Sequence, residues 1–409
     1  MKVKISSFLT ERQDRFKPEE ANNLGLKRLN KIDFSGKIHL IDKPTNTNMI
    51  LIKRGDLVIS GINIEKGAMA IYQGEEDITA TIHYSSYEFD KKKIDINYFK
   101  WFLKSAIFRK IVQTQIKGGI KTELKPKKFL PLEINLPSLQ TQKQILSKIQ
   151  SIEKEIKQLG QNISNDKTFL QKFKQSILQE AVQGKLVSQD PKDEPASELL
   201  RKIKAEKEKL IKEGKTKKQK ELSSIEEDEV PYELPKGWVW CRLGEVCDFI
   251  YGKWLTKQNR IAKGEYPVYG SNGVVGNFNK YLTGKRAIII GRKGSAGALN
   301  ISELPSWTTD VAYFLEESEN FNFKFVYYLL RTLNLESIGK GIKPGLNRNE
   351  VYILPLGLPP LPEQKRIVEK VDSLMKMCDE LELRIKENKK NSESLMGAVL
   401  RGVFEDQKL

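Results

Sequence analysis

The sequence predicts an α+β fold in which two mixed α/β globular domains are joined by two long antiparallel coiled-coil helices, with an internal pseudo-two-fold repeat. The main observation is that the sequence contains an internal repeat. A shift of 222 residues places segment 136–145 on 358–367, and both read Leu-Pro-x-Leu-x-x-Gln-Lys-x-Ile. The same shift places Gly-Ile-Lys-x-x-Leu at 119–124 on 341–346. Because a solenoid unit has only about 20–50 residues, this shift indicates two copies of a globular part followed by a helix.

Apolar residues at heptad spacing follow the repeated motif in both copies. They alternate steps of four and three residues, which is the spacing of a coiled-coil seam. Because a helix with one apolar seam is poorly stable alone in water, the two helices are expected to pack on each other. Polar residues interrupt the seam at Asp166 and at its repeat partner Asn388. The predicted seam residues are Ile145, Ile149, Ile152, Ile156, Leu159, Ile163, Ile367, Val371, Leu374, Leu381 and Ile385.

These patterns divide the chain into five parts. The first globular part contains strand-like runs at 49–52 and 57–60 and a helical, aromatic-rich segment at 98–115. The linker is dense in Lys and Glu and ends with an acidic run at 226–229, which predicts a solvated helix or a flexible strap. The predicted boundaries are 1–137 for the first domain, 138–187 for the central heptad helix, 188–233 for the charged linker, 234–361 for the second domain and 362–409 for the C-terminal heptad helix.

The second domain carries the clearest turn signal. Tyr-Gly-Ser-Asn-Gly at 269–273 places Asn-Gly between two β-prone runs, which predicts a hairpin. Residues 287–290 have the pattern of a buried strand that continues into a Gly-rich basic loop at 291–297. The first domain has an equivalent strand and loop at 57–68. The offset between these landmarks is 230 residues rather than 222, so the two copies differ in loop length.

The charge balance narrows the class of ligand. The net charge is +17, and a protein this basic usually binds a polyanion or an anionic membrane surface. No apolar run reaches about 18 residues, so no transmembrane helix is expected. The three cysteines are scattered, which suits a reducing compartment better than a disulfide framework. The cytoplasm is the predicted location.

Motifs that mark enzymes are absent from the sequence. There is no Walker phosphate loop, and the glycines at 291, 294 and 297 do not have the spacing of the dinucleotide fingerprint. His39 and His83 both lie in the first half, so a metal site or a histidine-based triad would break the repeat. We therefore predict a chain with no catalytic residue, no metal and no cofactor of its own.

Gly-rich basic loops recur in both domains and suit a nucleic acid. They let backbone N–H groups approach phosphates while Arg and Lys add charge, and Arg and Asn also pair with base edges. Such loops occur at 291–297 and 340–349 in the second domain and at 117–125 in the first. The predicted contacts with double-stranded DNA are Ser60, Asn63, Lys66, Lys117, Lys121, Lys125, Tyr269, Ser271, Asn272, Arg292, Lys293, Ser295, Lys340, Lys343, Asn347 and Arg348.

The order of these features resembles the DNA-specificity subunit of type I restriction-modification systems over essentially the whole chain. The most specific segments are 176–186, which resembles the end of the family's central helix, and Pro-Pro-Leu-Pro-Glu-Gln-Lys at 359–365. Segments 266–273 and 341–348 resemble one recurrent class of target-recognition domain. The first domain lacks the Tyr-Gly-Ser-Asn-Gly hairpin, so it is expected to read a different half-site.

The resemblance implies a function. Each globular domain would be a target-recognition domain that reads one half-site in the major groove, and the paired helices would set the spacer between the halves. The helices would dock two N6-adenine methyltransferase subunits, which use S-adenosylmethionine. Two restriction/translocase subunits, which use ATP and Mg²⁺, would complete an endonuclease. The chain itself would be a non-catalytic, cytoplasmic, nucleoid-associated protein of a bacterium or archaeon that binds no membrane.

Two other functions stay open at this point. A structural adaptor whose basic domains bind acidic proteins would explain the heptads and the charge, but not the recurrence of the Gly-rich loops. Competition by duplex DNA distinguishes it from a DNA reader. A nuclease or methyltransferase acting alone would need the motifs that are missing, and a cofactor-binding assay on the isolated chain tests that alternative.

Overall fold

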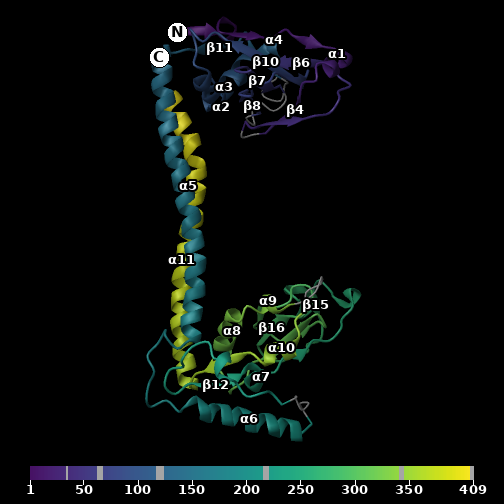
Figure 1. Ribbon diagram of the computed structural model, residues 1–409, viewed down its shortest axis with the longest axis vertical. Helices are drawn as coiled ribbons and strands as arrows, with labels where there is room; N and C mark the ends of the chain where they lie inside the picture. The colour runs from purple at the N-terminus through teal and green to yellow at the C-terminus, as the bar shows by residue number, and fades with distance from the viewer. Residues whose placement is uncertain (34–35, 62–67, 117–123, 215–220, 340–344, 406–409) are drawn as a thin grey trace. The chain divides into compact units, whose positions relative to one another are not determined.

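The fold comes from a computed structural model, whose described residues are 1–33, 36–61, 68–116, 124–214, 221–339 and 345–405. The chain divides into two compact units, Met1–Asn165 with Lys386–Leu409 and Asp166–Ile385. Helices α5 (Leu139–Val182) and α11 (Leu361–Glu405) each contribute residues to both units. Both units mix helices and sheets (Figure 1), which confirms the predicted fold class.

The first unit is built on two larger sheets and one strand pair. The pair is β1-β11, and the sheets have the orders β2-β10-β7-β8 and β3-β6-β9-β4-β5. Its strands are β1 (Lys2–Lys4), β2 (Leu9–Glu11), β3 (Arg15–Phe16), β4 (Arg28–Ile32), β5 (Ile38–Ile41), β6 (Met49–Ile52), β7 (Leu57–Ser60), β8 (Met69–Ile71), β9 (Ile78–Thr81), β10 (Tyr84–Phe89) and β11 (Glu133–Asn135). Its shorter helices are α1 (Pro18–Asn23), α2 (Ile96–Lys104), α3 (Ala106–Gln115) and α4 (Pro126–Phe129).

The second unit has the same plan with a different accessory sheet. The pair is β12-β20, and the sheets are β13-β19-β16-β17 and β15-β14-β18. Its strands are β12 (Val239–Arg242), β13 (Ile250–Tyr251), β14 (Tyr266–Gly270), β15 (Gly273–Phe278), β16 (Ala287–Gly291), β17 (Leu299–Ser302), β18 (Trp307–Thr308), β19 (Ala312–Glu316) and β20 (Pro355–Leu358). Its shorter helices are α6 (Ala196–Lys212), α7 (Leu243–Val246), α8 (Phe323–Thr332), α9 (Leu335–Ile338) and α10 (Arg348–Tyr352).

The internal repeat is visible in the topology. In both units a four-stranded antiparallel sheet contains a wholly buried strand, β7 in the first unit and β16 in the second. In both, the last strand of this sheet in the sequence, β10 or β19, leads to a pair of helices, α2 with α3 and α8 with α9. In both, an early strand pairs with the strand that precedes the long helix. The two units therefore repeat the same order of elements, and helix α3, with 10 residues against 4 in α9, accounts for most of the difference between the two offsets.

The long helices pack antiparallel within each unit. In the first unit, Ile145 and Ile149 of α5 share a core with Leu400 and Phe404 of α11. In the second unit, the α5 residues Leu170, Ile177 and Ala181 pack with Ile367 and Val371 of α11, and the two helices lie side by side (Figure 1). There the Lys174 ammonium also lies 2.8 Å from Asp379 and 2.9 Å from Glu382.

The predicted seam is buried only in part. Ile145, Ile149, Ile163, Ile367 and Val371 are buried. By contrast, the side chains of Ile152, Ile156, Leu374 and Ile385 are half-buried. Leu159 and Leu381 are exposed, so the seam prediction is wrong at these two positions. Leu400 and Phe404, which were not predicted, are buried because the aromatic helix α2 packs against them in the first unit.

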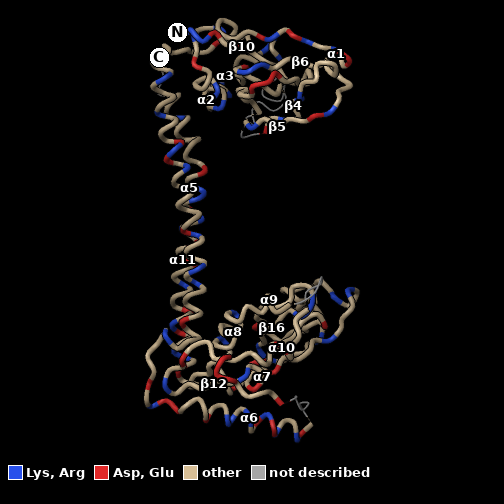
Figure 2. The backbone as a smooth tube through the Cα atoms, in the orientation of Figure 1, with Lys and Arg blue, Asp and Glu red and all other residues tan. Residues whose placement is uncertain are grey.

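The structure refines one prediction about helices and corrects another. The helical segment 98–115 is divided in two, because Ser105 adopts an extended conformation between α2 and α3 and its hydroxyl accepts the Phe108 N–H. The charged linker is neither a fully solvated helix nor a flexible strap where the structure describes it. Helix α6 alternates basic and acidic residues (Figure 2) but buries Ala196, Leu199 and Ile203 in the core of the second unit.

A buried arginine fixes the end of the linker to the second unit. The side chain of Arg242 is 3% exposed, and its guanidinium donates to both carboxylate oxygens of Glu229 at 2.8 and 2.6 Å. It also donates to the carbonyl oxygens of Ser223, Ser224 and Ile353. Sequence reasoning assigned the acidic run to solvent because the partner lies outside the linker in the chain.

We expect Glu229→Gln to remove a stabilisation that depends on pH. The Arg242 hydrogen bonds lower the pKa of Glu229 to about 2, below the value of about 4.3 in an unfolded chain. A lowered carboxyl pKa stabilises the fold fully above the unfolded value, and the stabilisation is lost as pH falls from about 4.3 towards 2. Urea unfolding of wild type and variant from pH 6 to pH 2.5 measures this difference, which should shrink on acidification. Glu227→Gln is the control, and an equal pH trend in both variants would contradict the role of Glu229.

Candidate nucleic-acid interface

Three loops of the second unit meet where strand β16 ends. Gly291 closes this strand, and a Cβ atom there would overlap the carbonyl oxygens of Ser295 in the next loop and of Ser271 in the β14–β15 turn. The Leu346 N–H, just before α10, donates to the Arg292 carbonyl at 2.8 Å. The sequence predicted all three loops as DNA contacts from their composition, and the fold places them against one another. We call this site the loop junction: the turn 271–273, the loop 291–297 and residues 345–348.

A buried tyrosine of the sheet anchors the loop junction. Tyr313 of β19 is 1% exposed, and its hydroxyl donates to the Leu346 carbonyl at 2.9 Å. Burial raises the pKa of Tyr313 to about 12, so the hydroxyl keeps its proton and remains a donor near neutral pH. Leu346 is thus held through both its N–H and its C=O, which fixes the start of α10 on the sheet.

Two arginines flank an aromatic ring at the loop junction. The Arg292 guanidinium donates through Nε and Nη2 to the Asp310 carbonyl, at 2.9 and 2.6 Å. Arg348 donates through Nη1 to the Phe249 carbonyl at 3.0 Å. The guanidinium carbons of Arg292 and Arg348 lie 5.3 and 4.7 Å from the centre of the Tyr251 ring. These contacts hold two half-buried cations in fixed positions, and sequence reasoning missed Tyr251 because no local pattern links it to either arginine.

The other predicted contacts of the second unit divide by exposure. The side chains of Asn272, Lys293, Ser295 and Asn347 are exposed at the loop junction, and Ser271 is half-buried there. Asn347 also caps α10 by accepting the Asn349 N–H. Tyr269 is 9% exposed, and its hydroxyl donates to the Ile301 carbonyl. The ring thus lies in the buried part of β14, and the DNA contact of Tyr269 stays a prediction.

The first unit has an equivalent junction. The Leu124 N–H donates to the Gly61 carbonyl at 2.9 Å, just beyond the end of β7, as Leu346 does to Arg292 in the second unit. Lys125 is exposed beside it. Ser60 is 8% exposed at the end of β7, and its DNA contact stays a prediction. The remaining predicted contacts lie outside the described residues: Asn63, Lys66, Lys117, Lys121, Lys340 and Lys343.

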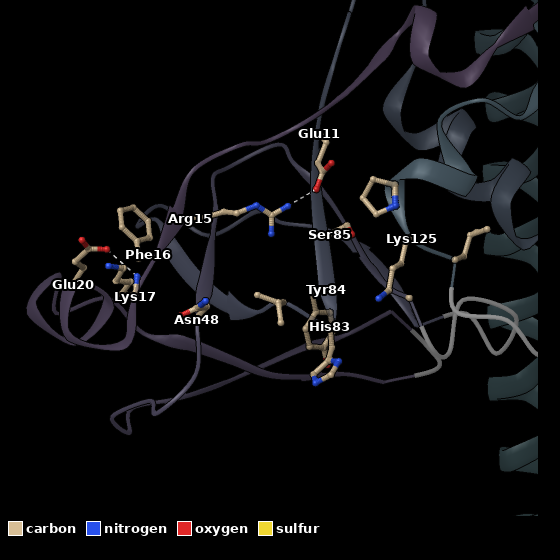
Figure 3. A pocket seen from close by; sticks show the side chains of 14 residues that line it. Glu11, Arg15, Phe16, Lys17, Glu20, Asn48, His83, Tyr84, Ser85 and Lys125 are labelled. Atoms are coloured by element: carbon tan, nitrogen blue, oxygen red, sulfur yellow. Dashed lines mark hydrogen bonds and ion pairs between the residues drawn. The ribbon is translucent and has the colours of Figure 1, made fainter.

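A pocket opens next to this junction in the first unit. Its volume is about 520 Å³, and Figure 3 shows its lining by strand β2, strand β3 and the β9–β10 turn. The Arg15 guanidinium donates to Glu11 at 2.8 Å across the pocket wall. Asn48, His83 and Lys125 add polar groups. Sequence reasoning missed Arg15 and Asn48 because they lie on segments without any Gly-rich signal.

The glutamine of the repeated motif, Gln142 in one copy and Gln364 in the other, has the same structural role in both units. Gln142 and Gln364 are each 0% exposed at the start of a long helix. The Gln142 side chain accepts the Asp95 N–H at 2.8 Å and donates to the Pro137 carbonyl at 2.9 Å. Gln364 accepts the Asn322 N–H at 2.8 Å and donates to the Pro359 carbonyl at 3.1 Å. Because Asp95 and Asn322 cap α2 and α8, each glutamine joins its globular part to its long helix.

Replacing either buried glutamine by alanine should destabilise the protein. Gln142→Ala leaves the Asp95 N–H and the Pro137 carbonyl without their side-chain partner in a buried place, which costs about 1–3 kcal/mol. Gln364→Ala should cost a similar amount. Urea unfolding measures both, with the exposed Gln158→Ala on α5 as the control, for which a change within about 0.5 kcal/mol is expected. Equal effects of Gln142→Ala and Gln158→Ala would contradict the joining role.

The described residues contain neither a candidate metal site nor a candidate membrane span. No three His, Cys, Asp or Glu side chains in the described ranges are grouped so that they could hold a metal ion. In the same ranges, no helix combines the length and the apolar character that crossing a membrane requires.

Known proteins of one family match this chain. Residues 235–389 match the type I restriction modification DNA specificity domain. The specificity subunit of the Escherichia coli type I restriction enzyme EcoAI is 36% identical over 255 residues, which are 56% of this chain and 43% of that protein. The EcoEI specificity subunit of the same species is 31% identical over 247 residues, 52% of this chain and 41% of that protein. The chain thus spans less than half the length of these two relatives.

Solved structures of low sequence identity share the fold. One chain comes from a study of complex assembly and conformational transition of the type I restriction-modification system. It has a TM-score of 0.66 at 15% identity and covers 99% of this chain and 97% of that chain. The HsdS subunit from Thermoanaerobacter tengcongensis has a TM-score of 0.58 at 16% identity, with 99% and 96% covered. Residues 235–389 therefore match a type I restriction modification DNA specificity domain, and the chain is similar to the specificity subunits of type I restriction enzymes, the family that its motifs resemble.

Proposed function

We propose that this chain is the subunit that selects the DNA target of a type I restriction-modification complex. The observation that carries the proposal is the loop junction, where three loops place Lys293, Arg292 and Arg348 together in a unit that bears the specificity domain. Exposed Lys suits phosphate oxygens, and exposed Asn and Ser suit base edges. The net charge of +17 favours association with the duplex.

The target is proposed to be bipartite. The two units share a topology but differ in the residues at their junctions, with two arginines in the second unit and the Arg15 pocket in the first. Two readers with different surfaces recognise two different half-sites. Because α5 and α11 each have one end in either unit, the pair is proposed to fix the unspecified spacer between the half-sites.

The partners and chemistry are proposed from the family. The long helices dock two methyltransferase subunits, and two restriction/translocase subunits join the complete enzyme. Those partners bind S-adenosylmethionine, ATP and Mg²⁺, while this chain binds no cofactor and catalyses no step itself. The complex methylates N6 of adenine within the target and cleaves DNA that lacks this mark.

Lys293→Ala tests the phosphate contact that the loop junction offers. Lys293 is exposed next to the fixed Arg292, and a Lys that neutralises one phosphate adds about −0.9 to the slope of log K against log salt concentration. The variant should bind all duplexes more weakly and flatten this slope by about 0.9. Fluorescence anisotropy with a labelled duplex at 50–300 mM salt measures both quantities.

Lys285→Ala is the matched control for this experiment. Lys285 is exposed just before β16, at the end of the strand opposite to the loop junction. It should leave affinity and slope unchanged. The same slope for wild type and Lys293→Ala would remove the phosphate contact, and failure of duplex DNA to compete with an acidic protein ligand would favour the adaptor function instead.

A further inference from the structure

Trp254 is unusually exposed for a tryptophan. Its side chain is 72% exposed, whereas tryptophan in folded proteins is highly buried on average. The next residue, Leu255, is 6% exposed and anchors the segment in the second unit. The backbone therefore presents the indole outward while its neighbour points inward. An apolar ring that is held in solvent at a fixed place marks a contact surface.

The segment that carries Trp254 is fixed to the sheet by its backbone. The Gly252 N–H donates to the Ala312 carbonyl at 3.1 Å, and the Lys253 N–H donates to the Thr308 carbonyl at 2.9 Å. The Lys253 carbonyl accepts the indole N–H of Trp307 at 3.1 Å. A Cβ atom on Gly252 would overlap the carbonyl oxygen of Thr309, so only glycine permits this close approach. The indole of Trp254 is thus presented from a rigid base, which lowers the entropy cost of a contact.

The charged residues near Trp254 in the sequence are basic. Residues 249–264 include Lys253, Lys257, Arg260 and Lys263 and no Asp or Glu. Lys253 and Lys257 are exposed on either side of the indole in the sequence. Aromatic rings between cations are the combination that binds nucleic acid, since the cations contact phosphates while the ring stacks on bases.

The segment is continuous with the loop junction. Tyr251, three residues before Trp254, has its ring next to the guanidinium groups of Arg292 and Arg348. Lys253 is joined to Thr308, and the Thr309 N–H donates to the Tyr269 carbonyl at 3.0 Å, in the strand that leads into the turn 271–273. The indole therefore extends the same surface that holds the predicted base contacts.

We propose that Trp254 inserts its indole between two base pairs at the edge of the half-site that the second unit reads. Lys253 and Lys257 hold the phosphates on either side of the step. Apolar wedges of this kind partly unstack a base step and kink the duplex. A step that unstacks easily is preferred, so Trp254 adds specificity at a position with no base-edge hydrogen bond. This inference rests on the proposed DNA-reading function and assigns one residue of that surface.

The test uses the full chain and two duplexes. One bears the split motif identified by methylome sequencing, with 2-aminopurine placed in turn at each adenine in and next to the half-site, and the other has a mixed sequence. Wild type should change the 2-aminopurine fluorescence at one step, because the base there loses one stacked base and gains the indole as its neighbour. Trp254→Ala should lose this signal and bind the motif duplex about 5- to 100-fold more weakly. Trp254→Phe should keep a part of both.

Leu304→Ala is the matched control, since Leu304 is an exposed apolar residue of the same unit that follows β17. It should bind and unstack DNA as wild type does, and circular dichroism confirms that each variant is folded. Equal affinity of Trp254→Ala and wild type would overturn the inference. A loss of affinity without any 2-aminopurine signal in wild type would overturn insertion as well. Failure of wild type itself to prefer the motif duplex would instead overturn the proposed function.

Discussion

Gly291→Ala should abolish recognition of the half-site that the second unit is proposed to read. A Cβ atom at this position overlaps two backbone carbonyl oxygens, those of Ser295 and Ser271, and neither can move away as a flexible side chain could. The turn 271–273 and the loop 291–297 must therefore separate. Because both loops carry proposed contacts, binding should fall to the non-specific level, a loss of about a thousandfold or more. The overpacking should also destabilise the protein by about 1–3 kcal/mol.

Gly345→Ala is the matched control for this variant. Gly345 belongs to the same loop junction, but the nearest heavy atom to an added Cβ would be the Arg292 carbonyl oxygen at 3.9 Å. Affinity for the motif duplex and urea stability should both stay near the wild-type values. Anisotropy titrations together with unfolding curves separate loss of recognition from loss of fold. Retained specific binding by a folded Gly291→Ala protein would show that the three loops do not act as one surface.

Removing one heptad from each long helix should change the length of the DNA spacer. The deletions are Asn162–Thr168 in α5 and Arg384–Lys390 in α11, which keep the apolar spacing of both helices in phase. Seven helical residues correspond to about 10 Å, or about 3 base pairs of B-DNA at 3.4 Å each. Methylation of the original motif should be lost, and a motif with the same half-sites and a spacer shorter by about 3 base pairs should appear.

Deletion from α5 alone is the control for the paired deletions. It puts the two seams out of register, so it should lower stability without producing a defined new motif. Methylome sequencing of hosts that express each variant reports the outcome. An unchanged spacer in the paired deletion, with the protein folded, would contradict the role of the helices as a ruler.

Features that repeat along the chain were predictable from the sequence. The shift that relates Gln142 to Gln364 and the heptads after each of them needed no knowledge of long-range contacts. Strands β7 and β16 were predicted because a continuous apolar run between turn signals identifies a buried strand. The hairpin at 269–273 followed from the Asn-Gly turn and is present as β14 and β15.

Features that depend on a partner far away in the chain were not predictable. Arg242 meets Glu229 and Ile353, and Gln364 meets Asn322, and no spacing rule connects these residues. The buried face of α6 could not be predicted, because only Ala196, Leu199 and Ile203 are buried in a helix that is otherwise rich in charged residues. At the candidate site, the loops were predicted from their glycines. Tyr251 and Trp254 were missed because a single aromatic residue, in a two-residue strand or in the loop after it, carries no pattern.

The most direct test is the methylome of a host that expresses this chain together with a type I methyltransferase subunit, compared with the same host that expresses the methyltransferase alone. The proposed function predicts a new N6-methyladenine motif that appears only with this chain and consists of two different half-sites around a fixed spacer. Single-molecule sequencing measures the motif directly. Absence of any new motif, when the two subunits are shown to be expressed and to purify together, would contradict the account.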